Sequence, residues 1–348
     1  MKKVIFFFSL AVFTCSFYAC QDEISDKETL SFHEDGDFKS NHSRNCSSYK
    51  VLAQKLKDNP GLAKKLENIE KHTQRAINAK PGNGNGNGGG NGGGPGGGGG
   101  GGGDPTPYNG TVQIPVYVHV IYSNANENIS EAQINSQIAV LNEDFTATNG
   151  DVGQVPAEFA GLVADSEIEF TLAGVTRKSS TRTSWGTNDA MKFASNGGVD
   201  VVTPGTHMNI WVCNIGGGIL GYAQFPGDDP ATDGIVVSPQ YFGTTGFVSA
   251  PFDQGRTTTH EVGHYLNLRH IWGDGRCNRD DFVSDTPTSD RPNYGCPSYP
   301  TVHCRTTDMT MNYMDYVDDA CMYMFSEGQK DRMRALFATG GARESIVL

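Results

Sequence analysis

The sequence has little positive charge for its size. Lysine and arginine total 27 against 39 aspartate and glutamate residues, which gives a net charge of −12 at pH 7. Binding to a polyanion depends on clustered basic side chains. We therefore expect no nucleic acid among the partners of this chain.

The sequence also lacks a hydrophobic run long enough to span a membrane. Its early apolar stretch, 4–12, follows a basic start and is typical of an export signal, so we assign 1–19 to a signal peptide. Cys20 and the three residues before it resemble a relaxed bacterial lipoprotein cleavage site, and an ordinary signal cleaved nearby is the alternative. We predict a secreted, extracellular or cell-surface protein of a bacterium, with contact to the membrane only through a lipid anchor at Cys20.

Helix and strand periodicity is missing from a Pro-, Asp- and Tyr-rich stretch that holds four of the eight cysteines: Cys277, Cys296, Cys304 and Cys321. In an exported chain, such a cluster predicts two disulfides that hold irregular backbone together. Three pairings remain open at this point. Cys46 and Cys213 stand apart from the cluster.

A glycine tract divides the chain. Of the 22 residues at 82–103, 17 are glycine, so the tract cannot pack a core and predicts a flexible tether. Before the tract, 49–79 predicts one or two short amphipathic helices broken at Pro60. A segment this short cannot form a domain of its own, so it either docks on the larger unit after the tract or is discarded.

After the tract the pattern predicts an α+β unit. Alternating apolar residues at 112–120 predict a strand, and a capping box of Ser130 and Gln133 opens a helix that packs on the sheet. A second capping box, of Ser326 and Gln329, opens a last helix. Further strands are predicted at 168–175, 208–215, 222–225 and 235–238, a helix from Thr257, and the last helix at 326–337.

The segment His260-Glu261-Val262-Gly263-His264 carries the pattern that points to chemistry. Residues four apart lie one above the other on a helix, so His260 and His264 can direct two imidazole nitrogens at one zinc ion. Glu261 lies beside them, where it can take a proton from the attacking water. The third histidine, His270, follows after a turn at Asn267, because asparagine tolerates the left-handed conformation that ends a helix. Satisfied surface histidines on an amphipathic helix are the alternative.

These residues resemble the metzincin pattern HExxHxxGxxH, which is followed by a methionine-containing turn. Asn267 stands in place of the usual glycine, and the turn lies at 312–316. Within the metzincins the chain is similar to the pappalysin family, in particular to its small microbial members of the ulilysin and cytophagalysin type. The supporting segments are 220–226, 285–287 and 314–319. The implied fold is metzincin-like α+β: a mixed twisted sheet with a backing helix and an active-site helix, then an irregular disulfide-stapled C-terminal subdomain that ends in a helix.

The resemblance assigns roles to the turn and to the rim of the cleft. Met314 is implied as a packed floor under the zinc. Tyr316 is implied as a donor to the oxyanion that develops on the scissile carbonyl, with packing under the turn as its alternative. The strand of Gly221, Tyr222 and Ala223 is implied to pair with extended substrate by β-augmentation, although by itself it is a glycine-flanked edge strand.

The resemblance also implies disulfide pairs and a second metal. The family joins the first cysteine with the third and the second with the fourth, which gives Cys277 with Cys304 and Cys296 with Cys321. The same loop binds calcium in some relatives, and the oxygen ligands here would be Asp281, Asp285 and Thr286. Acidic loop residues that simply face water are the alternative.

The predicted function is zinc-dependent hydrolysis of internal peptide bonds, with Glu261 passing the proton of the water to the leaving amine. Cys46 is predicted to take the fourth zinc position in a latent proenzyme, the alternatives being a disulfide with Cys213 or another structural role. Asp319 predicts a preference for Arg or Lys after the scissile bond, the alternative being a solvated acidic pair with Asp318.

The predicted organisation is a signal peptide at 1–19, a pro-segment at 20–81, a glycine-rich linker at 82–104 and a zinc metalloprotease catalytic domain at 105–348. We expect protein or peptide substrates, a catalytic zinc, a structural calcium and a monomer. Two rival functions are a catalytically inactive binding lipoprotein on the same scaffold, against which the intact Glu261 argues, and a zinc amidase or esterase.

Overall fold

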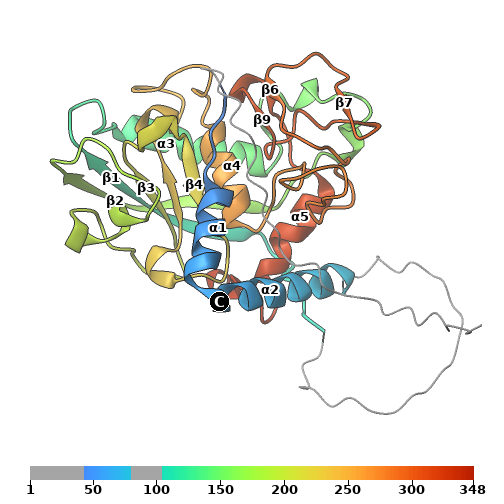
Figure 1. Cartoon of the computed structure of the whole chain (residues 1–348), viewed down its shortest axis with the longest axis horizontal. Helices are drawn as coiled ribbons and strands as arrows, with labels where there is room; N and C mark the ends of the chain where they lie inside the picture. Colours follow the sequence, from blue (N-terminus) through green and yellow to red (C-terminus); the bar gives the residue numbers. More distant parts are fainter. Residues whose placement is uncertain (1–42, 80–103) are drawn as a thin grey trace, which may run out of the picture. The chain divides into compact units, whose positions relative to one another are not determined.

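A five-stranded sheet organises the fold in the computed structural model, which describes residues 43–79 and 104–348. The predicted signal peptide, Cys20 and the glycine tract lie outside the described residues. The strand order is β2-β1-β3-β5-β4, and all neighbours are parallel except β4, an antiparallel edge strand (Figure 1). The bounds are β1 (Val112–Tyr122), β2 (Ile168–Ser179), β3 (Met208–Val212), β4 (Gly221–Ala223) and β5 (Ile235–Val237).

Two helices pack on one face of this sheet, α3 (Glu131–Phe145) and α4 (Arg256–Tyr265). The hydroxyl of Ser130 caps α3 by accepting the backbone N–H of Gln133. Alternate residues of β1 form one buried cluster with apolar residues of both helices, as the period of a strand requires. The other face of the sheet packs in a second cluster that includes Trp211, Tyr222 and Val236.

Three predicted elements have different ends in the structure. β3 stops at Val212 rather than at 215, because Ile215 donates its N–H to the hydroxyl of Ser238 instead of to a neighbouring strand. β4 begins at Gly221 and ends at Ala223, before the predicted end at 225. The helix predicted at 326–337 divides into α5 (Glu327–Arg334) and a 3-10 turn at Ala335–Phe337. Its predicted capping box of Ser326 and Gln329 is confirmed.

Irregular backbone fills most of the region after α4. It contains two short strand pairs, parallel β6 with β9 and antiparallel β7 with β8. Disulfides join Cys277 to Cys304 and Cys296 to Cys321, the two pairs that the resemblance implies. The strands are β6 (Tyr294–Gly295), β7 (Val302–His303), β8 (Thr306–Thr307) and β9 (Tyr316–Val317).

The two predicted helices before the glycine tract are present as α1 (Ser48–Asp58) and α2 (Pro60–Asn78). The break between them occurs at Asn59, whose side chain accepts the N–H of Gly61, and Pro60 fits the first turn, where its missing N–H costs no hydrogen bond. Both helices dock: α1 contacts β4, and α2 contacts α5 (Figure 1). None of the described helices is both long and apolar enough to cross a membrane.

Candidate metal centre

Three histidines meet at the end of α4. His260 and His264 lie one turn apart on this helix and are completely buried, and His270 is 1% exposed. Between them the chain reverses at Asn267, whose φ of +71° confirms the predicted left-handed conformation. The carbonyl of Asn267 accepts a hydrogen bond from Nε of Arg332 at 2.8 Å, which fixes the turn.

The hydrogen bonds of the three rings direct one nitrogen of each toward a common point. Each Nδ1 lies against an oxygen acceptor: the Tyr313 carbonyl at 2.7 Å, the Leu268 carbonyl at 2.8 Å and Oδ1 of Asp274 at 2.6 Å. Each ring therefore carries its proton on Nδ1 and presents a lone pair at Nε2. Burial lowers the pKa of His260 and His264 well below the usual value, which also favours neutral rings.

These Nε2 atoms fit a metal ion. Those of His264 and His270 are 3.1 Å apart, and Nε2 of His260 has no hydrogen-bond partner among the described residues. Lone pairs brought this close repel each other unless a cation lies between them. The sulfur of Cys46 joins the group, and all four ligand atoms lie within 4.8 Å of one another. Three nitrogens and one sulfur form a donor set that zinc accepts in tetrahedral sites.

Met314 packs directly beneath the helix that carries the histidines. A Cβ added at Gly263, between His260 and His264 on α4, would collide with Sδ of Met314, so the missing side chain of Gly263 leaves the room that Met314 occupies. The ring of Tyr316, two residues later, is centred 5.7 Å from that of His260 and 4.8 Å from that of His270. Its hydroxyl donates to the carbonyl of Cys46 at 3.4 Å.

Glu261 is buried beside the histidines and is held by the segment before the catalytic domain. Its Oε2 accepts the hydroxyl of Ser48 at 2.7 Å and the thiol of Cys46 at 3.5 Å. Burial raises the pKa of Glu261 to about 7. Burial, and then the charge of Glu261, raise the pKa of the Cys46 thiol in the absence of a metal.

The same segment lies along the edge strand β4. Cys46 forms a parallel bridge with Gly221, Ser47 donates its N–H to the Gly221 carbonyl at 3.1 Å, and Ser48 Oγ accepts the N–H of Ala223 at 2.8 Å. The predicted rim strand is therefore paired with extended backbone of this chain itself. The side chain of Tyr222 points away, and its hydroxyl donates to Asp189 at 3.0 Å, so only the backbone of Tyr222 can contact a bound peptide.

Asp319 is fully buried and holds an arginine. Oδ1 of Asp319 lies 2.6 Å from Nη2 of Arg44, and its Oδ2 accepts the backbone N–H groups of Gln254 and Arg256. Arg44 also donates to the carbonyl of Val317. The alternative of a solvated Asp318–Asp319 pair is wrong for Asp319, because its side chain has no exposure to solvent.

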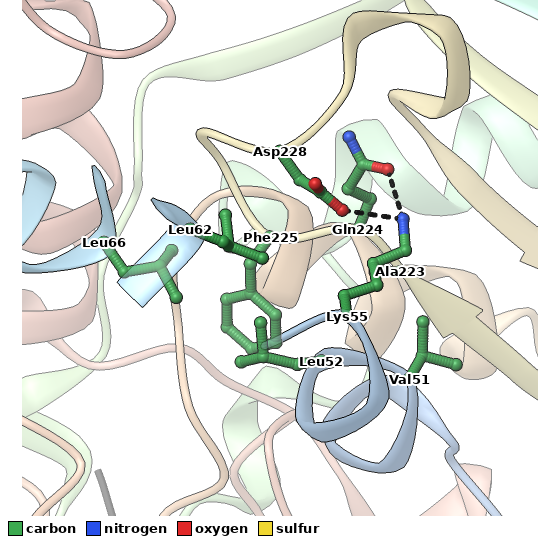
Figure 2. A pocket seen from close by; sticks show the side chains of 9 residues that line it. All are labelled: Val51, Leu52, Lys55, Leu62, Leu66, Ala223, Gln224, Phe225 and Asp228. Atoms are coloured by element: carbon green, nitrogen blue, oxygen red, sulfur yellow. Dashed lines mark hydrogen bonds and ion pairs between the residues drawn. The ribbon is translucent and has the colours of Figure 1, made fainter. Parts of the chain in front are cut away.

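Helix α1 continues over the rim beyond β4. Figure 2 shows Val51, Leu52 and Lys55 of α1 facing the chain at 223–228. Tyr49, at the start of α1, covers the metal centre, with its ring centred 5.3 Å from that of His270. The segment 44–55 thus covers the three histidines, Glu261 and the rim strand.

The remaining predictions concern Cys213 and the calcium ligands. Cys46 and Cys213 are both free and buried, so the alternative of a disulfide between them is wrong. Asp281 accepts the hydroxyl of Thr286 at 2.8 Å, whereas Asp285 accepts from Ser326 and the N–H of Gly328 at the start of α5. The calcium site therefore stays a prediction.

Sequence reasoning missed four residues of the site: Arg44, Ser48, Tyr49 and Asp274. Asp274 lies four residues after His270, and no spacing pattern marks an acceptor for a histidine ring. Arg44 precedes Cys46 by two residues, and its basic charge so close to a lone cysteine is a signal that could have pointed to Asp319. The roles of Ser48 and Tyr49 depend on contacts with α4 and β4, which the sequence does not reveal.

Three buried histidines on and after a helix, a neighbouring glutamate and a methionine floor define a metal-dependent protease of the metzincin class. Residues 201–338 match the Peptidase_M43 family, described as pregnancy-associated plasma protein-A. An extracellular metalloprotease of Arthroderma benhamiae is 32% identical over 249 residues, which cover 67% of this chain and 76% of that protein. The chain belongs to this M43, or pappalysin, family of metalloproteases.

Solved structures agree with this assignment. Mature mirolysin of Tannerella forsythia, in complex with a cleaved peptide, is 47% identical with a TM-score of 0.67, over 69% of this chain and 96% of that chain. A promirolysin mutant of the same organism is 39% identical with a TM-score of 0.74, over 87% of this chain and 97% of that chain. The resemblance to the pappalysins and the metzincin-like fold class are confirmed.

Proposed function

We propose that this metalloprotease is a secreted zinc endopeptidase that cleaves before Arg or Lys and is made as a latent proenzyme. The observation that carries the proposal is the segment 44–48, which presents a sulfur to the three histidines and an arginine to Asp319. The relatives named extracellular metalloproteases and the predicted signal peptide support secretion.

In the proposed mechanism, His260, His264 and His270 would hold the zinc, and the acceptors of the Nδ1 protons keep each ring oriented. Zinc, when bound, would acidify the attacking water and polarise the carbonyl of the bond to be cut. Glu261 takes the proton of this water and passes it to the leaving amine. The hydroxyl of Tyr316, which already donates to a carbonyl at Cys46, would donate to the oxyanion of the substrate.

In this proposal the enzyme is latent because the metal and the general base Glu261 are both occupied by residues of the pro-segment. The sulfur of Cys46 lies where it would serve as a fourth ligand of the zinc, and the hydroxyl of Ser48 donates a hydrogen bond to the carboxylate of Glu261. The larger coverage of the promirolysin match, compared with the mature enzyme, supports a pro-segment in this chain. We keep the predicted boundaries of the pro-segment, 20–81, and of the catalytic domain, 105–348.

Specificity is proposed to come from Asp319. A buried carboxylate already paired with a guanidinium favours an arginine or lysine of the substrate over a neutral side chain. The segment 44–48 runs parallel to β4, and its Arg44 at Asp319 precedes Cys46 at the histidines. In a substrate, the arginine at Asp319 would instead follow the bond at the metal. The substrate would therefore run in the opposite direction, antiparallel to β4. Lipidation at Cys20, a structural calcium and a monomeric state stay predictions.

The test compares wild-type protein with Glu261→Ala, both produced as the full chain. After maturation, the wild type should digest casein, lose activity with a zinc chelator and regain it with added zinc. Glu261→Ala should keep one zinc per chain by metal analysis and lose activity by roughly 10²- to 10⁴-fold, because the proton transfer is gone. Substantial casein digestion by the variant contradicts the mechanism, and hydrolysis of amides or esters alone favours the rival function.

A further inference from the structure

Lys55 of α1 occupies a pocket lined by acceptor atoms. Its Nζ lies 2.9 Å from Oδ2 of Asp189 and 2.8 Å from Oδ2 of Asp228, and it donates to Oε1 of Gln224 at 2.7 Å. Figure 2 shows the ammonium group between Gln224 and Asp228. We call Asp189, Gln224, Asp228 and Thr232, whose hydroxyl lies 3.4 Å from Nζ, the Lys55 pocket.

The catalytic domain builds this pocket without help from Lys55. Asp189 is held by the buried Lys192 at 2.9 Å and by the hydroxyl of Tyr222 at 3.0 Å. Gln224 is held by the hydroxyl of Thr232 and by the carbonyl of Asp229. Asp189, Gln224 and Thr232 are therefore positioned by contacts that do not involve α1.

The charge of the pocket is incomplete without a bound cation. Lys192 balances Asp189, whereas the ion pair found for Asp228 among the described side chains is the one with Lys55. With α1 in place, the side chains of Asp189 and Asp228 are at most 10% exposed; removal of 43–79 would uncover them and leave one net negative charge in the pocket. Such a site attracts an ammonium or guanidinium group. The ammonium group of Lys55, which already lies between these acceptors, indicates that the ligand is a basic side chain; the negative charge alone would not.

The pocket lies on the opposite side of the metal centre from Asp319. Along the segment, Arg44 reaches Asp319, Cys46 reaches the histidines, Ser48 contacts Ala223, and Lys55 reaches Gln224, which directly follows β4. In the proposed function, Asp319 binds the residue after the cut bond. The Lys55 pocket then faces residues of the substrate that precede this bond.

We propose that the Lys55 pocket is a second subsite, which binds a lysine or arginine side chain on the amino-terminal side of the cleaved bond. This inference rests on the proposed function, because the direction of the substrate is set by Asp319. The pro-segment thus blocks both specificity sites with basic side chains of its own, Arg44 on one side of the metal and Lys55 on the other.

The test uses the full chain after maturation and fluorogenic peptides with arginine fixed after the cut bond. Each position before the bond carries lysine in one peptide and norleucine, which has a similar length and no charge, in its pair. At one position, lysine should raise kcat/KM by about tenfold, and this ratio should fall with added salt. Asp228→Asn should bring the ratio close to one, whereas Asp229→Asn, next to it on the exposed side, should retain the wild-type ratio.

The outcomes distinguish failure of the proposed subsite from failure of the proposed function. If lysine has no advantage at any position while arginine is still preferred after the bond, the pocket only docks the pro-segment and the subsite is wrong. An unchanged ratio in Asp228→Asn also overturns it. Loss of the arginine preference, or of proteolysis itself, contradicts the proposed function and the subsite together. The comparison of peptides with the wild type needs no variant, so poor folding of Asp228→Asn cannot obscure the result.

Discussion

Individual side chains of the segment 44–55 occupy positions that a substrate would need. Arg44 pairs with the buried carboxylate of Asp319, Cys46 places its sulfur beside the histidines, and Ser48 contacts both Glu261 and the rim strand. Each contact joins residues more than 170 positions apart in the sequence, the shortest being Ser48 to Ala223, with a separation of 175. The proposed inhibition would therefore be distributed over several contacts, and each can be tested separately.

Replacement of Cys46 by alanine should shorten latency. The change removes the sulfur that would bind the metal and its contact with Glu261. Loss of a hydrogen bond to a charged group costs about 1.5 to 3 kcal/mol, so we expect a roughly ten- to hundredfold shorter time to half-maximal activity. The measurement is the activity of purified full-length protein followed over time. Cys213→Ala is the control, since Cys213 is also free and buried but lies outside the cluster of metal ligands. A Cys46→Ala protein as latent as the wild type would contradict the proposed role of Cys46 in latency.

Replacement of Asp319 should change specificity. Asp319→Asn keeps the size of the side chain and removes its charge, so kcat/KM for peptides with Arg or Lys after the bond should fall by about ten- to a hundredfold relative to peptides with leucine. Asp319→Ala should do the same and also loosen the start of α4, because the N–H groups of Gln254 and Arg256 lose their acceptor. Profiling a peptide library measures both effects, with Asp318→Ala as control. A wild type that shows no preference for Arg or Lys contradicts the proposed specificity. An unchanged preference in the variants shows that residues other than Asp319 determine it.

The three histidines of the candidate metal centre could be predicted because their positions depend on one helix and the turn that follows it. A spacing of four residues places His260 and His264 together whatever surrounds them, and Asn267 marked the turn that brings in His270. Arg44 and Lys55 could not be found in this way. Their partners lie on segments that approach only in the folded chain, and no local period encodes that approach.

Among the helices and strands, sequence periodicity predicted the long elements. It gave wrong ends where a side chain forms a hydrogen bond with the backbone or the helix tightens. β3 ends early at a hydroxyl acceptor, and the last helix tightens into a 3-10 turn at Ala335–Phe337. The docking of α1 and α2 was left open by the sequence, because an amphipathic face predicts burial but not the surface that provides it.

The disulfide between Cys296 and Cys321 should support the specificity pocket. Cys321 ends the 3-10 turn that begins with Asp319, so this bond restrains the backbone that carries the carboxylate. Replacing both cysteines with serine should lower the free energy of unfolding by about 2 to 4 kcal/mol and raise KM for arginine peptides. The matched control replaces Cys277 and Cys304, whose bond spans a similar length of chain. That variant should lose comparable stability without the change in KM, and equal KM effects in both variants would contradict a local role.

For the whole molecule, the contacts of the pro-segment predict that a cut in the glycine tract does not by itself produce activity. Residues 43–79 are held at several places. These include the ion pairs of Lys55 and the two hydrogen bonds from Arg332 to Glu70, at 2.9 and 2.5 Å. A cut between 82 and 103 leaves all of these contacts in place and removes only the tether, which contributes a local concentration of about a millimolar.

The experiment inserts the recognition sequence of an unrelated protease into the tract and measures activity after cleavage at a series of dilutions. The cut protein should stay latent when concentrated and gain activity on dilution, while the uncut protein stays latent throughout. Glu70→Gln in the cut protein should become active at a higher concentration, because its bond to Arg332 is weaker. Full activity immediately after cleavage would show that the tether, rather than the contacts, maintains latency.

The filled cleft also sets the order of events in a population of molecules. A copy whose own residues 44–48 lie across its histidines cannot act as enzyme and substrate at once, so its first cut comes from another copy or from a different protease. If the proposed specificity lets an activated copy cleave latent ones, the rate should rise as active copies accumulate. Maturation in this proposal should show a lag that lengthens when the protein is diluted and shortens where molecules accumulate.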